Sequence, residues 1–390
     1  MRPADPMQPE SQSLDRQMAT DTPVICIIYN RARLARNLMD RLRQIRPRRM
    51  LIVADGPKPG NNADALACAQ ARTEFERIDW DCSVDRDYAE SNLGCRRRIL
   101  SGLDWAFGLV DRAIVLEDDI DTHPHFFGWA GRMLCVYAER DDGAMLSGHN
   151  PLVRWARVAP STAGIPSRRG GIYGWATWRH KWQAVQKTCV GGSAGMAAAD
   201  VAARGFEPVL GALYTFYLEQ ARTVPSLSWD VDWSLRMAMS GRISVVSPVN
   251  LVHNLGLGPD ATITKDGDDM LFYLPRPTDE DSTAQESLLA PDTLCQLPPG
   301  ADDRVFDRAR VLIELLVRTR DPAMARRLAR REDLPLDGGM RLHLLPFRHA
   351  DETRGWIEHL AGQGVDPAAI QRWRRALADG NGPPVSGANR

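Results

Sequence analysis

The chain has 390 residues, of which 44% are hydrophobic and 25% are charged, as in an ordinary soluble globular protein with room for an appended domain. The 49 basic and 50 acidic residues balance, so net charge gives no support for a nucleic-acid partner or a membrane surface. No apolar stretch approaches the roughly 20 residues that span a bilayer. The seven cysteines are scattered without CxxC spacing, which predicts reduced thiols. We therefore expect a cytoplasmic protein with no integral membrane segment and no nucleic-acid partner; peripheral placement at the inner face of the membrane stays open.

The first part of the chain alternates strand patterns with helix patterns. Residues 1–22 are polar and proline-bearing and predict a disordered leader. Buried apolar runs predict strands at 24–29, 50–54 and 113–116, and 81–84 is a candidate short strand. Helical patterns separate them at 32–44, 63–76 and 95–110. This alternation predicts an α/β fold with a Rossmann-like, mostly parallel, doubly wound sheet.

Weaker signals follow in the second half. They predict a helix at 126–137, a strand at 143–146, a glycine- and aromatic-rich loop at 168–175, a helical segment at 191–204, and a late strand at 243–253 with a bend at Pro248. A stretch rich in proline and acids predicts a linker, and the arginine-, leucine- and alanine-rich remainder predicts a C-terminal helical region. The expected organisation is a leader, a catalytic domain, a linker and a small helical domain, over 1–22, 23–274, 275–303 and 304–390.

Three acids follow the fourth predicted strand directly, namely Glu117, Asp118 and Asp119. Carboxylates at a buried strand end repel one another and lose hydration, which a cation or a raised pKa relieves. Ligands of open α/β sheets bind outside the carboxyl ends of the strands. A divalent ion held there by one or two carboxylates, water and phosphate oxygens fits Mg²⁺ or Mn²⁺. The alternative, that Asp121 or Thr122 caps a helix that opens near Pro124, leaves the three acids without a role.

Two other strand ends carry candidate donor-binding residues. Tyr29, Asn30 and Arg31 follow the first strand, where the first loop of such a sheet meets a nucleotide. Arg31 is a candidate contact for phosphate or ribose, or a solvated arginine at a helix start. Asp55 ends the second strand and is a candidate partner of a base or ribose, or a turn aspartate that caps Gly56.

Arg98 and Trp175 are further candidates for the donor site. Arg98 lies near the start of a helix, where free backbone N–H groups attract anions, although charge runs on helices are usually solvated. Trp175 belongs to a tryptophan-rich stretch that suits sugar stacking, although tryptophan also fills cores.

A second acidic pair, Asp230 and Asp232, lies between tryptophans. A transferase that moves a sugar to a hydroxyl needs a base near the acceptor oxygen, and a carboxylate beside aromatic surfaces suits that role. Helix-capping preferences and the helix dipole, taken alone, favour the alternative, in which Asp230 caps a helix that runs to Ser240. His253 is a candidate metal ligand or phosphate contact, or a core histidine, and His149 is equally ambiguous.

Seven segments, in order and at sensible spacing, resemble the GT-A fold nucleotide-sugar glycosyltransferases. The most similar group is a bacterial one that resembles the animal N-acetylglucosaminyltransferase I type. The resemblance spans 23–264 and rests on IYNR at 28–31, ADGP at 54–57, NLGC at 92–95 through GLDW at 102–105, LEDD at 116–119, YGWATW at 173–178, WD at 229–230 and NLV at 250–252.

The resemblance implies roles for these residues. Asp119 would bind Mn²⁺ or Mg²⁺ as the last member of a DxD-type motif, and Glu117 or Asp118 would hold ribose or metal-bound water. Asp55 would face the nucleobase. Asp230 would be the base of an inverting displacement, with Asp232 as the alternative base. The resemblance also implies a histidine where Ile263 stands, and its absence raises the importance of His253.

We therefore predict a metal-dependent, inverting glycosyltransferase that acts in bacterial polysaccharide biosynthesis. It would transfer a hexosyl or N-acetylhexosaminyl group from a nucleoside diphosphate sugar, with UDP as the expected nucleotide, to a glycan or lipid-linked saccharide acceptor. Two alternatives stay open. One is a glycan- or nucleotide-sugar-binding module of the same fold without turnover, and the other is a metal-dependent phosphodiesterase.

Overall fold

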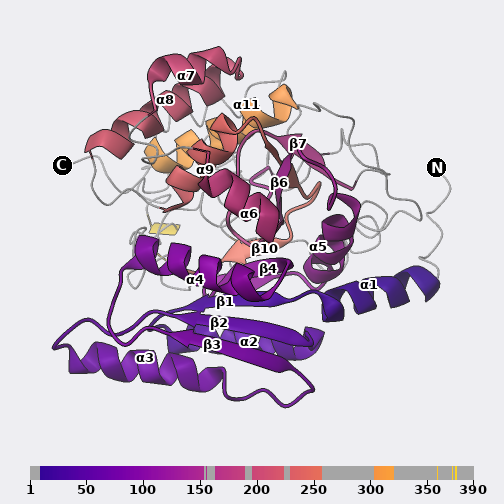
Figure 1. Cartoon of the computed structure of the whole chain (residues 1–390), viewed down its shortest axis with the longest axis vertical. Coiled ribbons are helices and arrows are strands. Elements are labelled where there is room, and N and C mark those ends of the chain that lie inside the picture. The colour runs from indigo at the N-terminus through magenta and orange to yellow at the C-terminus, as the bar shows by residue number, and fades with distance from the viewer. Residues whose placement is uncertain are drawn as a thin grey trace. The chain divides into compact units, whose positions relative to one another are not determined.

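The computed structural model describes residues 9–152, 155, 163–188, 196–223, 229–256 and 303–319, together with residues 358, 371, 374 and 375. The chain divides into two compact units. The first comprises Met1–Asn150, Val158–Leu255 and Pro277–Arg304, and the second comprises Pro151–Arg157, Gly256–Arg276 and Val305–Arg390. The elements drawn in Figure 1 are, in chain order, α1 (Pro9–Asp21), β1 (Val24–Ile28), α2 (Ala32–Ile45), β2 (Arg49–Ala54), α3 (Asn62–Glu74), β3 (Ser83–Tyr88), α4 (Cys95–Leu109), β4 (Arg112–Glu117), β5 (Ile120–Thr122), α5 (His125–Val136), β6 (Gly143–Ser147), β7 (Ile165–Ser167), β8 (Trp175–Trp178), α6 (Arg179–Gln186), α7 (Ala198–Ala203), α8 (Pro208–Thr223), α9 (Trp229–Met239), β9 (Ile243–Val246), β10 (Val252–Asn254) and α11 (Arg304–Thr319).

The first unit is built on a mixed, mostly parallel sheet with strand order β3-β2-β1-β4-β8-β6-β9-β7. β1 pairs in parallel with β2 and β4, so that Val24 lies opposite both Met50 and Ile114. β8 runs antiparallel to β4 and β6, and β7 runs antiparallel to β9. A second, two-stranded sheet joins β5 to β10. The prediction of an α/β fold with a mostly parallel sheet is confirmed.

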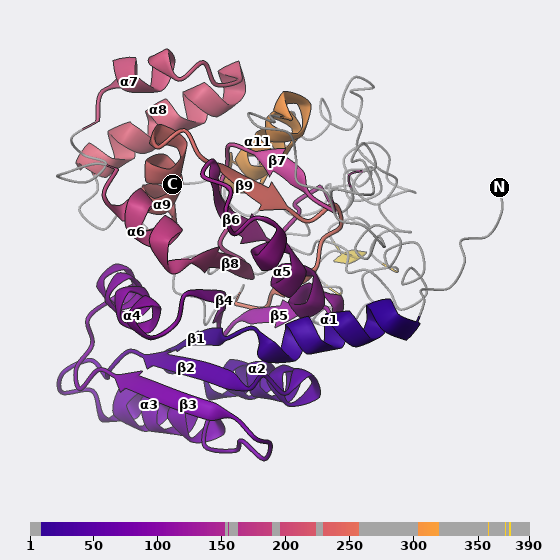
Figure 2. The same cartoon turned by 45° about the vertical axis from the view of Figure 1, so that its right-hand side comes forward.

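Helices cover both faces of the main sheet because the apolar strands are buried on both sides. In β1, Val24, Cys26 and Ile28 pack in a cluster with residues of α2, α3 and α5. Ile25 and Ile27 point the other way and share a cluster with residues of α4, α6 and α9. Figure 2 shows α4, α6 and α9 on one side of the sheet and α5 on the other. The acidic end of β4 is therefore held between two packed layers.

Gly102 allows α4 to lie close against β2. A Cβ at this position would meet Cγ1 of Val53 at 2.2 Å, far inside van der Waals contact. Only a glycine admits this spacing without a shift of the helix. The amino end of α4 is thereby placed close to the strand ends.

The N-terminal segment corrects one prediction, because residues 9–21 form helix α1 where a disordered leader was expected. α1 lies alongside α5, as both cartoons show. Asp15 in α1 and Arg132 in α5 form an ion pair at 2.7 Å, and both side chains are largely buried. Polar composition predicted disorder, but a buried ion pair and close helix packing supply the stabilisation that composition does not reveal.

Three other segments differ from expectation. β3 extends to Tyr88, beyond the predicted 81–84, and its polar side chains suit the edge position that it occupies. β8 begins inside the predicted loop at 168–175. The predicted strand at 243–253 is divided into β9 and β10 around Pro248.

The C-terminal predictions fall mostly outside the described residues. Of the predicted linker at 275–303, only Asp303 is described. The predicted helical region is represented by α11, in which Phe306 packs edge-on against Trp155 at a ring separation of 5.3 Å within the second unit.

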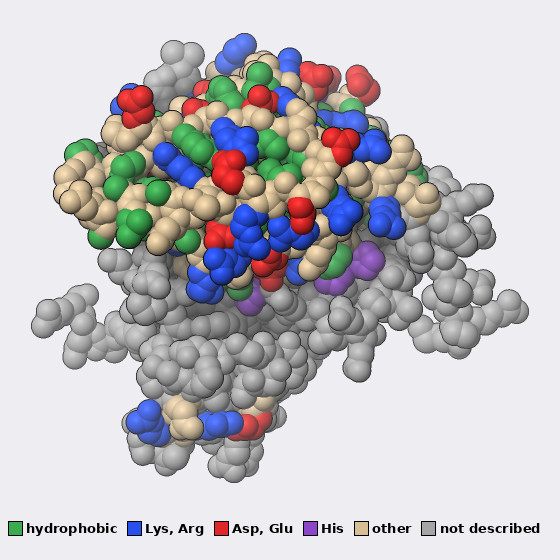
Figure 3. All heavy atoms as spheres, turned by 90° about the horizontal axis from the view of Figure 1, so that it is seen from below, with side chains coloured by type: hydrophobic (Ala, Val, Ile, Leu, Met, Phe, Trp, Pro, Cys, Tyr) green, Lys and Arg blue, Asp and Glu red, His purple; other side chains and the backbone are tan. Residues whose placement is uncertain are grey.

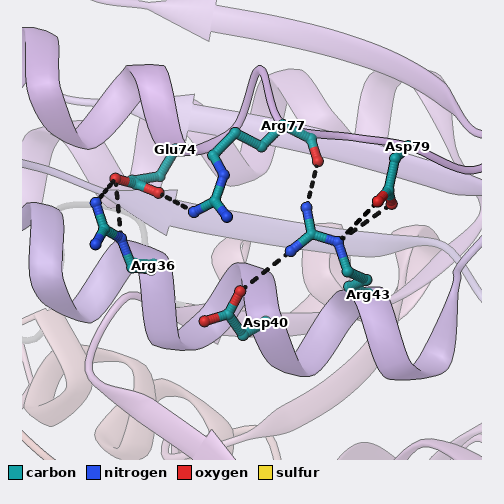
Figure 4. A network of polar contacts seen from close by, with 6 residues as sticks. All are labelled: Arg36, Asp40, Arg43, Glu74, Arg77 and Asp79. Atoms are coloured by element: carbon teal, nitrogen blue, oxygen red, sulfur yellow. Dashed lines mark hydrogen bonds and ion pairs between the residues drawn. The ribbon is translucent and has the colours of Figure 1, made fainter.

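Charged side chains of both signs are interspersed on the face that Figure 3 shows. One network joins α2, α3 and the segment after α3, and consists of Arg36, Asp40, Arg43, Glu74, Arg77 and Asp79 (Figure 4). Arg36 and Arg77 each contact the Glu74 carboxylate at 2.7 Å. Glu74 itself is buried, whereas the more exposed pair of Arg43 with Asp79 contributes little to stability. Each arginine of the network is matched by at least one carboxylate.

Candidate active site

The acidic triplet lies where β4 ends and the chain turns into β5. Asp118 is 3% exposed, and its backbone N–H donates to the carbonyl of Ile27 in β1 at 2.9 Å. Arg31, the residue before α2, forms an ion pair with Asp118 and another with Asp119 at 3.0 Å. The first loop of the sheet therefore supplies a guanidinium group to the triplet.

Glu117 is the member of the triplet with an unsatisfied polar atom. Its Oε1 is buried and has no hydrogen-bond partner. Burial raises the pKa of Glu117 well above its usual value, and the carboxylates of Asp119, Asp118 and Asp230 raise that pKa further. Arg31 opposes this effect. Burial also raises the pKa of Asp118 to about 6. Crowded carboxyl groups of this kind favour a bound cation.

Asp230 and Asp232 share the first turn of α9 but have different surroundings. Asp232 is 2% exposed and forms ion pairs with Arg96 of α4 at 3.0 Å and with Arg236 at 2.9 Å. Asp230 is half-buried and close enough to Glu117 for its charge to raise the pKa of that residue. Because α9 begins before Asp230, this residue lies within the helix and not at the capping position. Asp230 therefore lies within range of the charge of Glu117, whereas Asp232 joins α9 to α4.

The amino end of α4 lies beside the same carboxylates. Gly94, with φ of +79°, precedes this 15-residue helix, whose first turn has no acidic residue and no side-chain cap. Burial raises the pKa of the Cys95 thiol to about 12, and the carboxylates of Glu117 and Asp230 contribute. The backbone N–H groups at this end and the positive end of the helix dipole suit a phosphate group.

Tyr29 and Asn30 are held by a residue that the sequence analysis did not single out. Asp64 in α3 accepts hydrogen bonds from the Tyr29 hydroxyl at 2.7 Å and from Nδ2 of Asn30 at 2.6 Å. It also accepts one from the backbone N–H of Lys58 at 2.7 Å. Asp64 thus fixes the first loop against α3. The spacing Asn61-x-x-Asp64, a helix-capping signal, was the clue in the sequence.

Asp55 and Arg98 hold loops at the carboxyl ends of the strands. Asp55 is 5% exposed and accepts from the N–H groups of Gly56 and Leu93 at 2.8 and 2.9 Å, and from Nδ2 of Asn92 at 3.0 Å. Nε of Arg98 donates to the carbonyl of Ala54 at 3.1 Å. For Asp55, these contacts match the turn alternative.

Arg98 makes one further contact that explains its burial. Its Nη2 lies 2.8 Å from Oδ2 of Asp87 at the end of β3, and the residue is 4% exposed. Arg98 therefore ties α4 to two strand ends. A donor-binding role for Asp55 or Arg98 stays a prediction, and both have structural partners.

Trp175 lies inside the protein in β8. It is 0% exposed and packs among Trp182, Trp229 and Trp233, with ring separations of 6.3, 6.1 and 5.7 Å. Its Nε1 is buried without a hydrogen-bond partner. The tryptophan cluster supports α6 and α9 on the sheet, and Trp175 offers no exposed face to a sugar.

His253 lies in β10 opposite Asp121, two residues beyond the triplet. Burial lowers the pKa of His253. Asp121 forms an ion pair with Arg41 at 3.3 Å. The backbone N–H of Leu255, the residue after β10, donates to the carbonyl of Asp119 at 2.7 Å. The register brings His253 to Asp121, and a metal-binding role stays a prediction.

Tyr173 is a site residue to which the sequence analysis gave no role. The β4–β8 ladder ends at the pairing of Val115 with Trp175, and Tyr173 lies two residues before Trp175. Burial raises the pKa of the Tyr173 hydroxyl, and the carboxylates of Asp230, Asp119 and Glu117 raise it further. The clue in the sequence was the tyrosine that opens the motif at 173–178.

The carboxylates of the triplet fit a divalent ion only if the phosphate oxygens of a bound nucleotide complete the coordination of the ion. Among the residues that the structure describes, no group of three or more His, Cys, Asp or Glu side chains is placed to hold a metal ion. Mg²⁺ and Mn²⁺ sites that use substrate phosphates need only one or two carboxylates. Asp119 and Glu117, whose Oε1 lacks a partner, meet that smaller requirement.

Comparison of the chain with protein-family models and with curated protein sequences finds no match. Within the described part of the chain, no helix combines the length and the apolar character that crossing a membrane requires.

Proposed function

We propose that this chain is a metal-dependent, inverting glycosyltransferase of the GT-A type, with a UDP-sugar as donor and a glycan or lipid-linked saccharide as acceptor. One observation carries the proposal. The carboxylates of Asp119, next to the end of β4, and of Asp230, in α9, lie close enough to raise the pKa of Glu117, and all three raise the pKa of Cys95 at the amino end of α4. These elements are distant in sequence, and a purely structural role for the acids would not require like charges to gather in one region.

The proposed chemistry assigns each group a task. When bound, a Mn²⁺ or Mg²⁺ ion at Asp119 would neutralise charge on the departing nucleoside diphosphate. Arg31, beside Asp119, and the N–H groups of α4 would hold the diphosphate oxygens. Asp230 would accept the proton of the acceptor hydroxyl while the oxygen of that hydroxyl forms a bond to the anomeric carbon of the sugar. The bond from that carbon to the diphosphate oxygen breaks with its electron pair on the diphosphate, which inverts the configuration.

The surroundings of the two α9 carboxylates favour Asp230 over Asp232 as the base. Asp232 is occupied by Arg96 and Arg236, whereas the charge of Asp230 acts on Glu117. A phosphodiesterase that relies on a preformed metal cluster is disfavoured, because the described residues contain no group of three metal ligands. The same site would serve a binding module without turnover, and only activity separates that alternative from a transferase.

Release of UDP from UDP-sugars in the presence of Mn²⁺ tests this proposal. We expect turnover in the wild type, with water or an added saccharide as acceptor, and a loss of at least roughly 100-fold in Asp230→Asn with UDP binding retained. Asp121→Asn is the matched control, since Asp121 is paired with Arg41. UDP-sugar binding without turnover in the wild type would favour the binding module.

A further inference from the structure

Arg31 joins the two aspartates that follow β4 through a single nitrogen atom. Its Nη2 forms an ion pair with Oδ1 of Asp118 and another, at 3.0 Å, with Oδ2 of Asp119. The side chains of Asp118, Asp119 and Arg31 are 2%, 14% and 21% exposed. The guanidinium group of Arg31 therefore lies between the two carboxylates and neutralises part of their charge.

The backbone on both sides of this contact is held in place. The carbonyl of Arg31 accepts a hydrogen bond from the backbone N–H of Ala35 in α2 at 2.9 Å, and the carbonyl of Asp119 accepts one from the backbone N–H of Leu255 at 2.7 Å. An exchange of partners at this point therefore requires only rotation of side chains. Asp118 is the more buried aspartate and anchors Arg31, whereas the carboxylate of Asp119 is more exposed and is the one that can turn to a ligand.

A metal ion at Asp119 would compete with Arg31 for the same carboxylate. A divalent ion binds a carboxylate oxygen directly, at about 2.0–2.1 Å for Mg²⁺. An ion bound in this way would lie a few ångström from the guanidinium group, and two positive charges at that separation repel each other strongly in a partly buried site. The ion pair between Arg31 and Asp119 must therefore open before the ion is bound tightly.

We propose that Arg31 takes the place of the metal ion until a nucleotide binds, and that the diphosphate admits the ion by displacing Arg31 from Asp119. The inference rests on the proposed function and makes Arg31 the residue that couples metal binding to nucleotide binding. Arg31 keeps its ion pair with Asp118 and donates its freed N–H group to a diphosphate oxygen. The carboxylate of Asp119 is then available to the ion. Such coupling is reciprocal, so the ion raises the affinity for the nucleotide by the same factor.

The size of the effect depends on how often Arg31 leaves Asp119. If the Asp119 carboxylate is released in about one molecule in ten, the apparent affinity for the ion is about tenfold weaker than the intrinsic affinity. Arg31→Gln releases Asp119 in every molecule, so Mn²⁺ alone should bind about tenfold more tightly to this variant. With UDP bound, Arg31 has already left Asp119 in the wild type, so the substitution should no longer tighten the binding of Mn²⁺.

Titration of the protein with Mn²⁺, with and without saturating UDP, tests the inference, and the EPR signal of free Mn²⁺ measures binding. We expect Arg31→Gln to bind Mn²⁺ about tenfold more tightly than the wild type without UDP, and no more tightly with UDP. Arg31→Met, a second neutral variant, should behave in the same way if Arg31→Gln does not fold, and circular dichroism checks the folding of both. Arg41→Gln is the matched control, because Arg41 pairs with Asp121, two residues beyond Asp119. Its affinity for Mn²⁺ should stay within about twofold of the wild type.

The outcomes separate the inference from the proposed function. If the neutral variants bind Mn²⁺ alone no more tightly than the wild type, the inference is wrong. If they bind Mn²⁺ more tightly by the same factor with and without UDP, loss of a positive charge explains the result and the inference is also wrong. In both cases, Mn²⁺-dependent binding of UDP to the wild type leaves the proposed function standing. If neither the wild type nor the variants bind Mn²⁺, even with UDP, the proposed metal site is wrong and the inference fails with it.

Discussion

Replacing Asp232 by asparagine is expected to lower the free energy of unfolding by about 3 kcal/mol, because the change removes one side of a buried ion-pair network. Asp232 is 2% exposed and contacts Arg96 at 3.0 Å and Arg236 at 2.9 Å. The Arg96 side chain is 40% exposed and can regain water, whereas that of Arg236 is 11% exposed and would be left buried. The cost therefore falls at the lower end of the range of about 3–5 kcal/mol for breaking a buried pair.

Urea unfolding followed by tryptophan fluorescence measures this cost, since Trp229 and Trp233 lie on the same helix as Asp232. Asp230→Asn is the matched control. Asp230 is half-buried and is not held by two arginines, so its replacement should change the unfolding free energy by less than about 1 kcal/mol. A double variant, Asp232→Asn with Arg236→Gln, should cost less than the sum of its single changes.

The same pair of variants separates stability from catalysis. Asp232→Asn should retain turnover of UDP-sugars in the folded protein, and Asp230→Asn should lose it. An Asp232→Asn variant with wild-type stability and no turnover would refute this reasoning and make Asp232 the base.

Three further predictions concern the packing and charge of the first unit. The pKa of Lys181, which is 2% exposed, is lowered by burial from 10.5 to about 8, so the unfolded chain binds more protons between these values. Wild-type stability should therefore rise between pH 8 and 10.5 relative to Lys181→Met, by up to about 3 kcal/mol in urea unfolding at several pH values. Because the folded pKa of Glu117 lies well above its unfolded value, ionisation of this group favours unfolding. Glu117→Gln should therefore raise the melting temperature of the ligand-free protein at neutral pH, and an unchanged or lower value would contradict this. Gly102→Ala should destabilise the fold by roughly 1–3 kcal/mol, since its Cβ would lie 2.2 Å from Cγ1 of Val53, and Val53→Ala should restore part of the loss.

The parallel strands could be predicted because their signals are local. The apolar runs at 24–29, 50–54 and 113–116 became β1, β2 and β4, each with a central segment buried on both faces. The helical stripes between them became α2, α3 and α4. Periodicity is a property of neighbouring residues, so it can be read without knowing the fold.

Other features depend on partners that are distant in the sequence. β8 is a strand because its Ala176 pairs with Ile114 of β4 and Leu146 of β6, although glycine and aromatic residues precede it as in a loop. Pairing of this kind leaves little trace in a local pattern. The ordered helix α1 likewise depends on α5.

The prediction of the site was limited most by charged partners that lie far from the site residues in the sequence. The sequence left Asp232 open as an alternative to Asp230, because two residues in one helical turn have similar local surroundings. Arg96, separated from Asp232 by 136 residues, distinguishes them. The exposed aromatic residue at the triplet is Tyr173 and not Trp175, a distinction that requires knowing which face of the sheet is covered.

The most direct test of the proposed function is calorimetric binding of UDP with and without Mn²⁺, in the wild type and in Asp119→Ala. Asp121→Ala is the matched control, because Asp121 lies two residues away and pairs with Arg41. We predict that UDP binds in a Mn²⁺-dependent manner to the wild type and to the control, and at least roughly tenfold more weakly to Asp119→Ala. Binding that is indifferent to Mn²⁺, or unchanged in Asp119→Ala, would contradict the metal–diphosphate site. If UDP does not bind under any metal condition, a panel of GDP, CMP and dTDP decides between another nucleotide and a wrong assignment of the site.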